Sequence, residues 1–288
     1  MDAGALADDA VTSFDAIVAR DLLIAAAQRA GRIGLASFNP GGRTSARVEY
    51  KSGGSPVTAA DLAVDDFLKA ELAAAFPSAS WFSEETEDDP ARLSNDAVVI
   101  VDPIDGTRAF IDGDPRWAVS IALVVRGRPI AGVVHAPALD ETYAAAARSG
   151  ATLNSDALIV SARPTLAGAR IGGPRAMVHA LDRSAGLSLT LEPKIPSLAY
   201  RIALVARGGL DLAIASENAH DWDIAAADLI LAEAGGMLVD ARGEPLIYNQ
   251  EETRRPALFA ASKRLIGPFV AAAALAKAGQ NPAVASGL

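Results

Sequence analysis

One short segment constrains this chain more than any other. The apolar, β-branched run from Ala97 to Val101 predicts a buried strand, and it ends directly in the sequence DPIDGT. Two aspartates at the end of a buried strand are costly unless something positively charged binds them. The proline and glycine favour a sharp turn, in which Asp102 and Asp105 would face one point. Gly106 and Thr107 would then offer backbone N–H groups to an anion. The alternative is a turn with two solvated aspartates, but the flanking strand and the Gly-Thr pair favour a functional site.

Three further segments place acidic residues at the ends of expected elements, and each also has an ordinary structural explanation. The residues are Glu84 and Glu85 after a short strand, Asp223 at the expected start of a helix, and Lys51, Thr58 and Asp61 before another helix. The paired glutamates alone would indicate a solvated surface, and an aspartate near a helix start is a common cap. Thr58 with Asp61 resembles a capping box. Taken singly, none of the three segments predicts chemistry.

The order of expected elements divides the chain into two halves. Residues 1–150 favour an antiparallel-rich α+β half, with a hairpin at Gly127, and residues 151–288 an α/β half in which strands and helices alternate. The crossing is expected at Gly150 to Asn154, and a frayed tail at Asn281 to Leu288. Helices are expected from Asp15 to near Gly31 or Gly34, and at 59–76, 177–185, 198–206, 223–234 and 265–276. Strands are expected at 48–51, 81–83, 97–101, 118–126, 129–136, 141–147, 169–172, 210–215, 237–239 and 258–260.

Charge and composition exclude several classes of function. The formal net charge is −9, so the chain has no general attraction for nucleic-acid polymers or anionic membranes. There are no cysteines, which excludes disulfides, thiolate metal sites and thiol nucleophiles. Met1 to Ala10 lacks the pattern of a signal peptide, and no apolar run approaches the roughly 20 residues that span a bilayer. We therefore expect a soluble, cytoplasmic protein.

Together the four segments resemble the inositol monophosphatase superfamily of lithium-sensitive, magnesium-dependent phosphatases, from about Asp15 to about Leu275. Four ordered motifs carry the resemblance: Asp102 to Thr107 with Phe110 (DPxDGTxxF), Trp222 to Ala226 with Gly235 and Gly236 (WDxAA…AGG), Lys51 with Val57 to Asp61 (K…VTxAD), and Glu84 with Glu85 (GEE). The last motif departs from the family, because Ser83 replaces its glycine.

The resemblance implies a fold, a metal site and a set of roles. The implied fold is a layered αβαβα sandwich. Two or three Mg²⁺ ions would be held by Glu84, Asp102, the carbonyl of Ile104, Asp105 and Asp223, all oxygen ligands as hard cations require. Gly106 and Thr107 would hold the substrate phosphate through backbone N–H groups, and Asp105 and Asp223 would also bind the substrate. Asp61 would bond the Thr107 hydroxyl and help to orient the attacking water, and Glu84 would take part in activating it; these three residues are the catalytic candidates. Lys51 and Glu85 would support them. The implied reaction is in-line displacement by a metal pair, and lithium sensitivity and homodimers are implied with it.

The substrate is less constrained than the reaction. Ser216 stands where inositol monophosphatases have a glutamate, and Glu217 lies one residue away. Nucleotidase members start the preceding helix with Gly-Ser-Ser-Leu-Lys, and here Ser197 to Arg201 keeps only the basic last position. The Trp81 to Thr86 segment and the DPIDGTRAF run from Asp102 to Phe110 most resemble bacterial 3′(2′),5′-bisphosphate nucleotidases, which convert adenosine 3′,5′-bisphosphate to AMP. Inositol 1-phosphate, another sugar phosphate or histidinol phosphate are the alternatives, and an inactive phosphate-ligand binding protein is the alternative of another class. His220 and Arg201 are open between substrate contact and packing.

Overall fold

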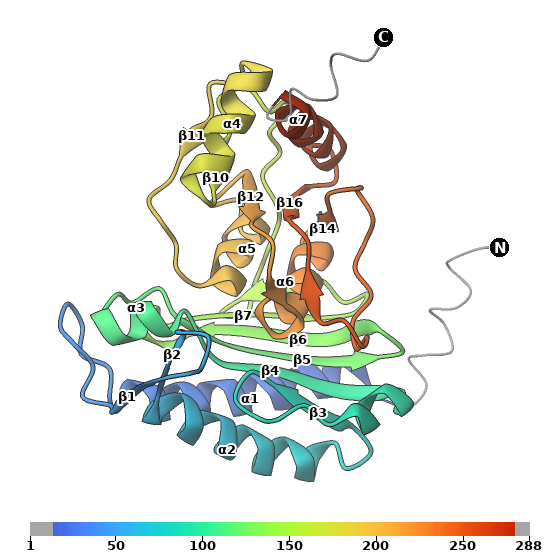
Figure 1. The fold of residues 1–288 in the computed structure, drawn as a ribbon. Coiled ribbons are helices and arrows are strands. Elements are labelled where there is room, and N and C mark those ends of the chain that lie inside the picture. Colours follow the sequence, from blue (N-terminus) through green and yellow to red (C-terminus); the bar gives the residue numbers. More distant parts are fainter. Residues whose placement is uncertain (1–13, 280–288) are drawn as a thin grey trace.

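The computed structural model describes residues 14–279 as five stacked layers of helices and sheets (Figure 1). Two helices, α1 (Ala16–Leu35) and α2 (Ala59–Ala75), cover the outer face of a seven-stranded sheet. Its strand order is β3-β4-β5-β6-β7-β8-β9. The strands are β3 (Ser80–Ser83), β4 (Ala97–Asp105), β5 (Ala118–Val125), β6 (Arg128–Ala136), β7 (Glu141–Ala146), β8 (Ala151–Leu153) and β9 (Asp156–Ala157).

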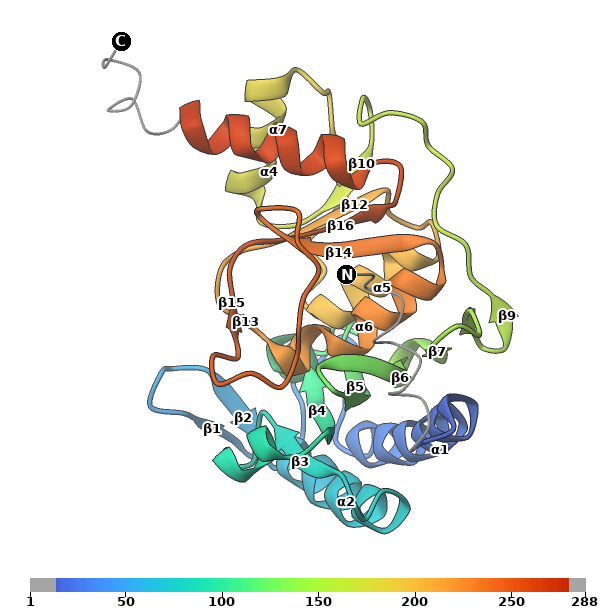
Figure 2. The ribbon, with the colours of Figure 1, turned by 90° about the vertical axis from the view of Figure 1, so that its right-hand side faces the viewer.

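A second helix pair separates this sheet from a smaller one. Helices α5 (Leu198–Ala206) and α6 (Asp221–Glu233) lie between the sheets, and α4 (Arg175–Ala185) and α7 (Ile266–Gly279) cover the far face, as both views show (Figures 1 and 2). The smaller sheet has the order β11-β10-β12-β16-β14. Its strands are β10 (Arg170–Gly172), β11 (Thr190–Leu191), β12 (Leu212–Ala215), β14 (Gly236–Asp240) and β16 (Leu258–Ser262). The predicted αβαβα sandwich is therefore confirmed.

Short elements complete the chain around these layers. They are the pairs β1 (Val48–Tyr50) with β2 (Pro56–Thr58) and β13 (Ala219–His220) with β15 (Arg254–Arg255), the helix α3 (Thr107–Asp112), and the 3₁₀ turns η3 (Pro90–Ser94) and η4 (Pro137–Leu139). No helix within residues 14–279 is long and apolar enough to cross a membrane.

Strand β4 lies between two hydrophobic cores, one on each face of the seven-stranded sheet. All nine of its residues are buried. Val99 and Val101 pack into the core with α1 and α2, whereas Val98 and Ile100 pack into the core with α5 and α6. Side chains alternate between the faces of a strand, so a strand covered on both faces must be apolar throughout. This explains why the segment reads as a continuous apolar run.

Most expected elements form, with two differences. The helix at 198–206 has the expected bounds, and Thr58 and Asp61 form the expected capping box at the start of α2. The expected crossing at Gly150 to Asn154 is wrong, because β8 and β9 extend the first sheet to Ala157. The division into halves at residue 150 stays a prediction. Helix α6 starts at Asp221, two residues earlier than expected. The expected tail at Asn281 to Leu288 and the absence of a signal peptide in Met1 to Ala10 lie outside the described residues.

Candidate active site

A β-bulge, rather than the expected sharp turn, brings Asp102 and Asp105 together. In a regular strand, residues three apart point to opposite faces. Here Asp102 pairs with Ser120 and Asp105 with Ala118 on β5, so β4 has one residue more than its partner between these pairs. One extra residue in one strand shifts the alternation and re-aims the side chains that follow. Strand β4 therefore continues through the motif, and both carboxylates reach the same side.

Asp223 comes to these aspartates from the first turn of α6. Its Oδ2 accepts the backbone N–H of His220 at 2.6 Å, so Asp223 occupies the third helical position and closes the helix start. The start is also held by Asp221, a buried residue whose carboxylate accepts Arg255 Nε at 2.7 Å and the backbone N–H of Asn249 at 3.1 Å. The expected cap and the expected metal ligand are thus the same residue.

The three aspartates form a buried cluster of negative charge that fits a divalent cation. Asp102, Asp105 and Asp223 each place a carboxylate oxygen within 4.8 Å of the others. Asp102 uses Oδ1 to accept Ile104 N–H at 3.0 Å, and Ser197 and Ala199 both donate to Oδ2 of Asp105 at 2.6 Å. One oxygen of each carboxylate is thereby fixed by the protein. Hard cations such as Mg²⁺ prefer such oxygen ligands.

Burial and the mutual repulsion of the carboxylates raise the pKa values of the three aspartates. Burial, followed by the charges of Glu84, Asp105 and Asp223, raises the pKa of Asp102 well above its usual value. Burial raises the pKa of Asp105 to about 6, although the Ser197 hydroxyl lowers it, and burial and Asp105 raise the pKa of Asp223. A bound cation reverses this balance by favouring the ionised carboxylates.

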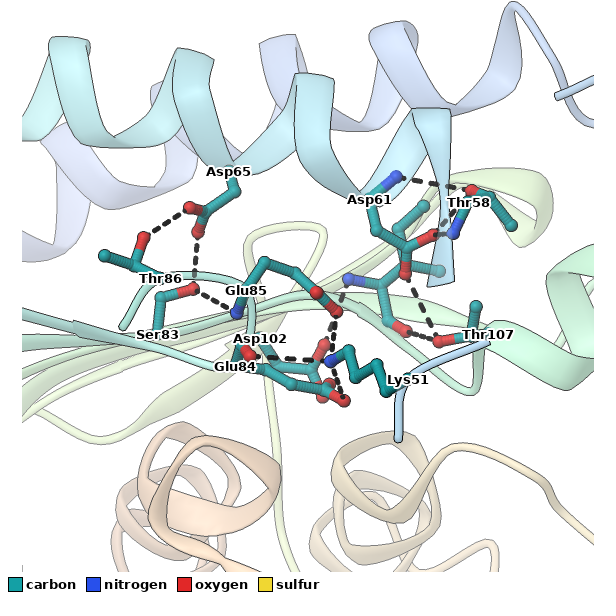
Figure 3. A network of polar contacts seen from close by, with 11 residues as sticks. Lys51, Thr58, Asp61, Asp65, Ser83, Glu84, Glu85, Thr86, Asp102 and Thr107 are labelled. Atoms are coloured by element: carbon teal, nitrogen blue, oxygen red, sulfur yellow. Dashed lines mark hydrogen bonds and ion pairs between the residues drawn. The ribbon is translucent and has the colours of Figure 1, made fainter. Parts of the chain in front are cut away.

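Glu84 lies beside the cluster but turns toward Lys51 (Figure 3). Lys51 Nζ, from the turn between β1 and β2, donates to Glu84 Oε1 at 3.1 Å and to Glu85 Oε1 at 2.8 Å. Glu84 is not one of the three residues whose carboxylate oxygens lie within 4.8 Å of one another. Its charge is nevertheless the largest cause, after burial, of the raised pKa of Asp102. Burial raises the pKa of Glu85 to about 7 despite its bond to Lys51. Lys51 therefore holds the paired glutamates at the edge of the site.

Asp61 links the start of α2 to the end of β4 (Figure 3). Its Oδ2 accepts Thr58 N–H at 2.8 Å, and its Oδ1 lies 3.2 Å from Thr107 Oγ1, which also lies 3.1 Å from the carbonyl of Ile104. Gly106 precedes this threonine with φ +91°, a conformation that favours glycine. Burial raises the pKa of Asp61 to about 6, and Thr58 partly lowers it. The structure therefore places Asp61 and Thr107 in the contact that the family resemblance implies.

A second buried aspartate of α2, Asp65, holds the loop that carries Glu84. Its Oδ1 accepts the hydroxyl of Ser83, and its Oδ2 accepts Thr86 Oγ1 at 2.7 Å (Figure 3). Trp81 Nε1 donates to Thr86 Oγ1 at 3.2 Å. The hydroxyl of Ser83, which stands in place of the family glycine, thus has a partner. Sequence reasoning missed Asp65, although its position one helical turn after Asp61 was the available signal.

Replacing Asp65 by asparagine is expected to loosen this loop. An amide has one acceptor oxygen in place of two, so one buried hydroxyl loses its partner, at a cost of about 1–3 kcal/mol. We expect the Mg²⁺ concentration for half-maximal phosphatase activity to rise about tenfold, as is typical when support of a metal ligand is lost. Asp66→Asn, at an exposed position on the same helix, is the matched control. Equal magnesium titrations for the two variants would contradict the role given to Asp65.

The segment expected to select the substrate divides into buried and exposed residues. Ser216 and Glu217 are exposed, and no contact joins them to the aspartates. The His220 ring stacks on Trp222 with centroids 4.4 Å apart, which makes it a packing residue in this structure. Arg201 lies in the first turns of α5 and bonds the carbonyl of Ile214 at 3.1 Å. Ser197, whose helix-capping role was detectable from the sequence, is the residue that touches the cluster.

Comparison with known proteins gives one consistent family. The inositol monophosphatase family model matches residues 18–274. Inositol monophosphatase 2 of Solanum lycopersicum is 34% identical over 77% of this chain and 87% of its own length. The 3′(2′),5′-bisphosphate nucleotidase CysQ of Aggregatibacter actinomycetemcomitans is 32% identical over 73% of this chain and 81% of its own. A histidinol-phosphatase of Chlorobaculum parvum is 34% identical over 80% and 88%.

Solved structures agree with these sequence relatives. The extragenic suppressor protein suhB of Bartonella henselae superposes with a TM-score of 0.77 at 28% identity, over 91% of this chain and 99% of that one. An IMPase of Thermotoga maritima gives 0.77 at 26% identity, over 90% and 98%.

Proposed function

The chain belongs to the inositol monophosphatase family and is a phosphoric monoester hydrolase, and from this premise we propose that it hydrolyses a small soluble phosphate monoester with Mg²⁺ as its cofactor. The observation that carries the proposal is the buried cluster of Asp102, Asp105 and Asp223 beside Glu84. Three buried like charges are unfavourable without a cation. In this proposal the four carboxylates and the carbonyl of Ile104 hold two or three Mg²⁺ ions.

The chain's own residues would orient the reactants around those ions. When bound, a magnesium pair supplies the positive charge that activates water and stabilises the leaving oxygen. Asp61 holds the Thr107 hydroxyl and, with Glu84, would orient the attacking water and accept its proton. Gly106 and Thr107 would present backbone N–H groups to the phosphate, between Asp105 and Asp223. Lys51 keeps Glu84 in place through its ion pair.

The preferred substrate in this proposal is a 3′(2′),5′-bisphosphate nucleotide. Support comes from the resemblance of Trp81 to Thr86 to bacterial nucleotidases and from the similarity to a protein named CysQ. Inositol 1-phosphate, other sugar phosphates and histidinol phosphate are the alternatives, and relatives with the first and last of these activities in their names are equally similar. An inactive phosphate-binding protein is disfavoured, since every implied ligand residue is present. Cytoplasmic location and a homodimer stay predictions.

A substrate panel tests the proposed function. With Mg²⁺ present, we expect the highest kcat/KM for adenosine 3′,5′-bisphosphate among four esters, the others being inositol 1-phosphate, fructose 1,6-bisphosphate and histidinol phosphate. The hydrolysis should stop when EDTA is added and return with excess Mg²⁺. A protein that binds one of these esters but releases no phosphate would contradict catalysis, and a higher kcat/KM for another ester would contradict the nucleotide assignment.

A further inference from the structure

A cavity of about 890 Å³ lies near the aspartate cluster, and none of the proposed metal ligands or catalytic residues lines it. Its lining residues come from the start of α4, the segment that follows β11, and α5. Figure 1 shows these elements in the second half of the chain. Its ionisable lining residues are Arg175, His179, Glu192, Lys194 and Arg201. The volume falls in the range of small-molecule sites.

The lining is positively charged in a chain of net charge −9. Glu192 is the only acidic residue that lines the cavity, and its Oε1 already accepts Arg170 Nε at 2.8 Å. Arg175 and Lys194 are exposed at the cavity, and neither has a side-chain hydrogen bond or ion pair with residues 14–279. The free charges of the lining are therefore cationic, which favours an anionic ligand.

Arg201 supplies a half-buried cation with a buried Nε to the same cavity. Its guanidinium gives one N–H to the carbonyl of Ile214 at 3.1 Å, while its buried Nε has no partner. The side chain fits because position 172 is glycine: a Cβ there would lie 3.1 Å from Arg201 Cδ. A buried donor left unpaired costs about 1–3 kcal/mol. Arg201 is thus held ready for an acceptor.

The segment that begins α5 connects the cavity to the aspartate cluster. Pro196 lines the cavity, and the next residue, Ser197, donates to Asp105 at 2.6 Å. Ser197 also packs against Gly106, since a Cβ at that glycine would lie 3.2 Å from the Ser197 nitrogen. Arg201 follows one helical turn later. Burial lowers the pKa of its guanidinium, and the negative charges of Asp105 and Asp223 act in the opposite direction. A ligand that reaches from one region to the other would pass along the start of α5.

We propose that this cavity binds a second phosphoryl group of the substrate, through Arg175, Lys194 and Arg201. The inference rests on the proposed phosphatase function and narrows it to bisphosphorylated substrates, one phosphate placed at the aspartate cluster and the other in the cavity. Guanidinium and ammonium groups suit phosphate oxygens through charge-assisted hydrogen bonds. A nucleoside bisphosphate and a sugar bisphosphate share this chemistry.

Matched pairs of substrates test the proposal. The ratio of kcat/KM between adenosine 3′,5′-bisphosphate and adenosine 3′-phosphate is measured with excess Mg²⁺, and likewise between fructose 1,6-bisphosphate and fructose 1-phosphate. In the double variant Arg175→Ala/Lys194→Ala, the ratio should fall about tenfold, the effect of about 1.4 kcal/mol. The pair that shows the fall identifies the nucleotide or the sugar as the source of the second phosphate. Lys263→Ala/Arg264→Ala removes the same charges from exposed positions outside the cavity, and the ratio should keep its wild-type value.

The outcomes separate this proposal from the proposed function. A ratio unchanged in the cavity variant for both substrate pairs, or lowered equally in the control variant, overturns the second-phosphate site while phosphatase activity stands. If the wild-type protein hydrolyses none of the four compounds, the proposed function fails instead. Calorimetric titration with adenosine 3′,5′-bisphosphate and with fructose 1,6-bisphosphate then decides. Weaker binding of either by the cavity variant than by the control supports the site, and equal or absent binding overturns it.

Discussion

Replacing Asp102 by asparagine is expected to lower magnesium-dependent phosphatase activity by at least about 10³-fold, the loss of about 4 kcal/mol of transition-state stabilisation. Asp102 belongs to the cluster with Asp105 and Asp223, and its side chain is buried in the sheet. An amide keeps the size of the side chain and can still accept Ile104 N–H through its oxygen. It removes the charge that a cation needs. Activity should therefore be lost while the fold remains.

Two measurements distinguish this result from unfolding. The circular-dichroism spectrum should match that of the wild-type protein. The thermal midpoint in EDTA should equal or exceed the wild-type value, because one of several mutually repelling charges has been removed. Asp156→Asn, at an exposed position on β9, is the control that should keep full activity. Substantial activity in purified, folded Asp102→Asn would refute the assignment of Asp102 as a metal ligand.

The sequence indicates this candidate site because its residues are local. Asp102, Asp105 and Gly106 sit within five residues, and a buried apolar strand leading into two aspartates has few explanations that avoid a cation. The means of bringing them together was not predictable. A bulge depends on the register of β5 against β4, and the one-residue difference between the strands is set by pairing rather than by either segment alone.

The parts that the sequence could not predict depend on long-range contacts. Strands β8 and β9 are short, and their membership of the first sheet follows from pairing with β7 rather than from any apolar pattern. Ser197 contacts Asp105 across 92 residues of chain. Arg175 and Lys194 line the same cavity because they follow β10 and β11, which pair in parallel. Each of these residues looks like an ordinary cap or surface cation by itself. The aspartate cluster was thus accessible to motif reasoning, and the cavity near it was not.

The pH dependence of stability provides the second large effect, with Asp105→Asn as its probe. Burial raises the pKa of Asp105 to about 6 in the metal-free protein, against about 3.8 when unfolded. The folded state therefore holds a proton that the unfolded state has released, and this contribution to stability is full below pH 4 and lost as pH rises through 6. A shift of this size corresponds to roughly 3 kcal/mol. Asparagine has no such penalty and keeps an acceptor for Ser197 and Ala199.

The variant should therefore gain on the wild-type protein as pH rises. In EDTA, the difference in free energy of unfolding between Asp105→Asn and wild type should grow by about 3 kcal/mol in favour of the variant between pH 4 and pH 8. His135 and His220, whose pKa values are lowered chiefly by burial and give the opposite slope, are common to both proteins and cancel. Asp102 and Asp223 add to the gain of the variant, because the charge of Asp105 raises their pKa values and asparagine removes that charge. Excess Mg²⁺ at pH 8 should reverse the order, because the wild-type carboxylate is stabilised by a cation that the amide binds poorly. Urea denaturation at each pH measures both effects. A difference in the free energy of unfolding that stays constant with pH would show that the pKa of Asp105 is not raised in the folded protein. Equal stabilisation of the two proteins by Mg²⁺ would show that Asp105 is not a metal ligand.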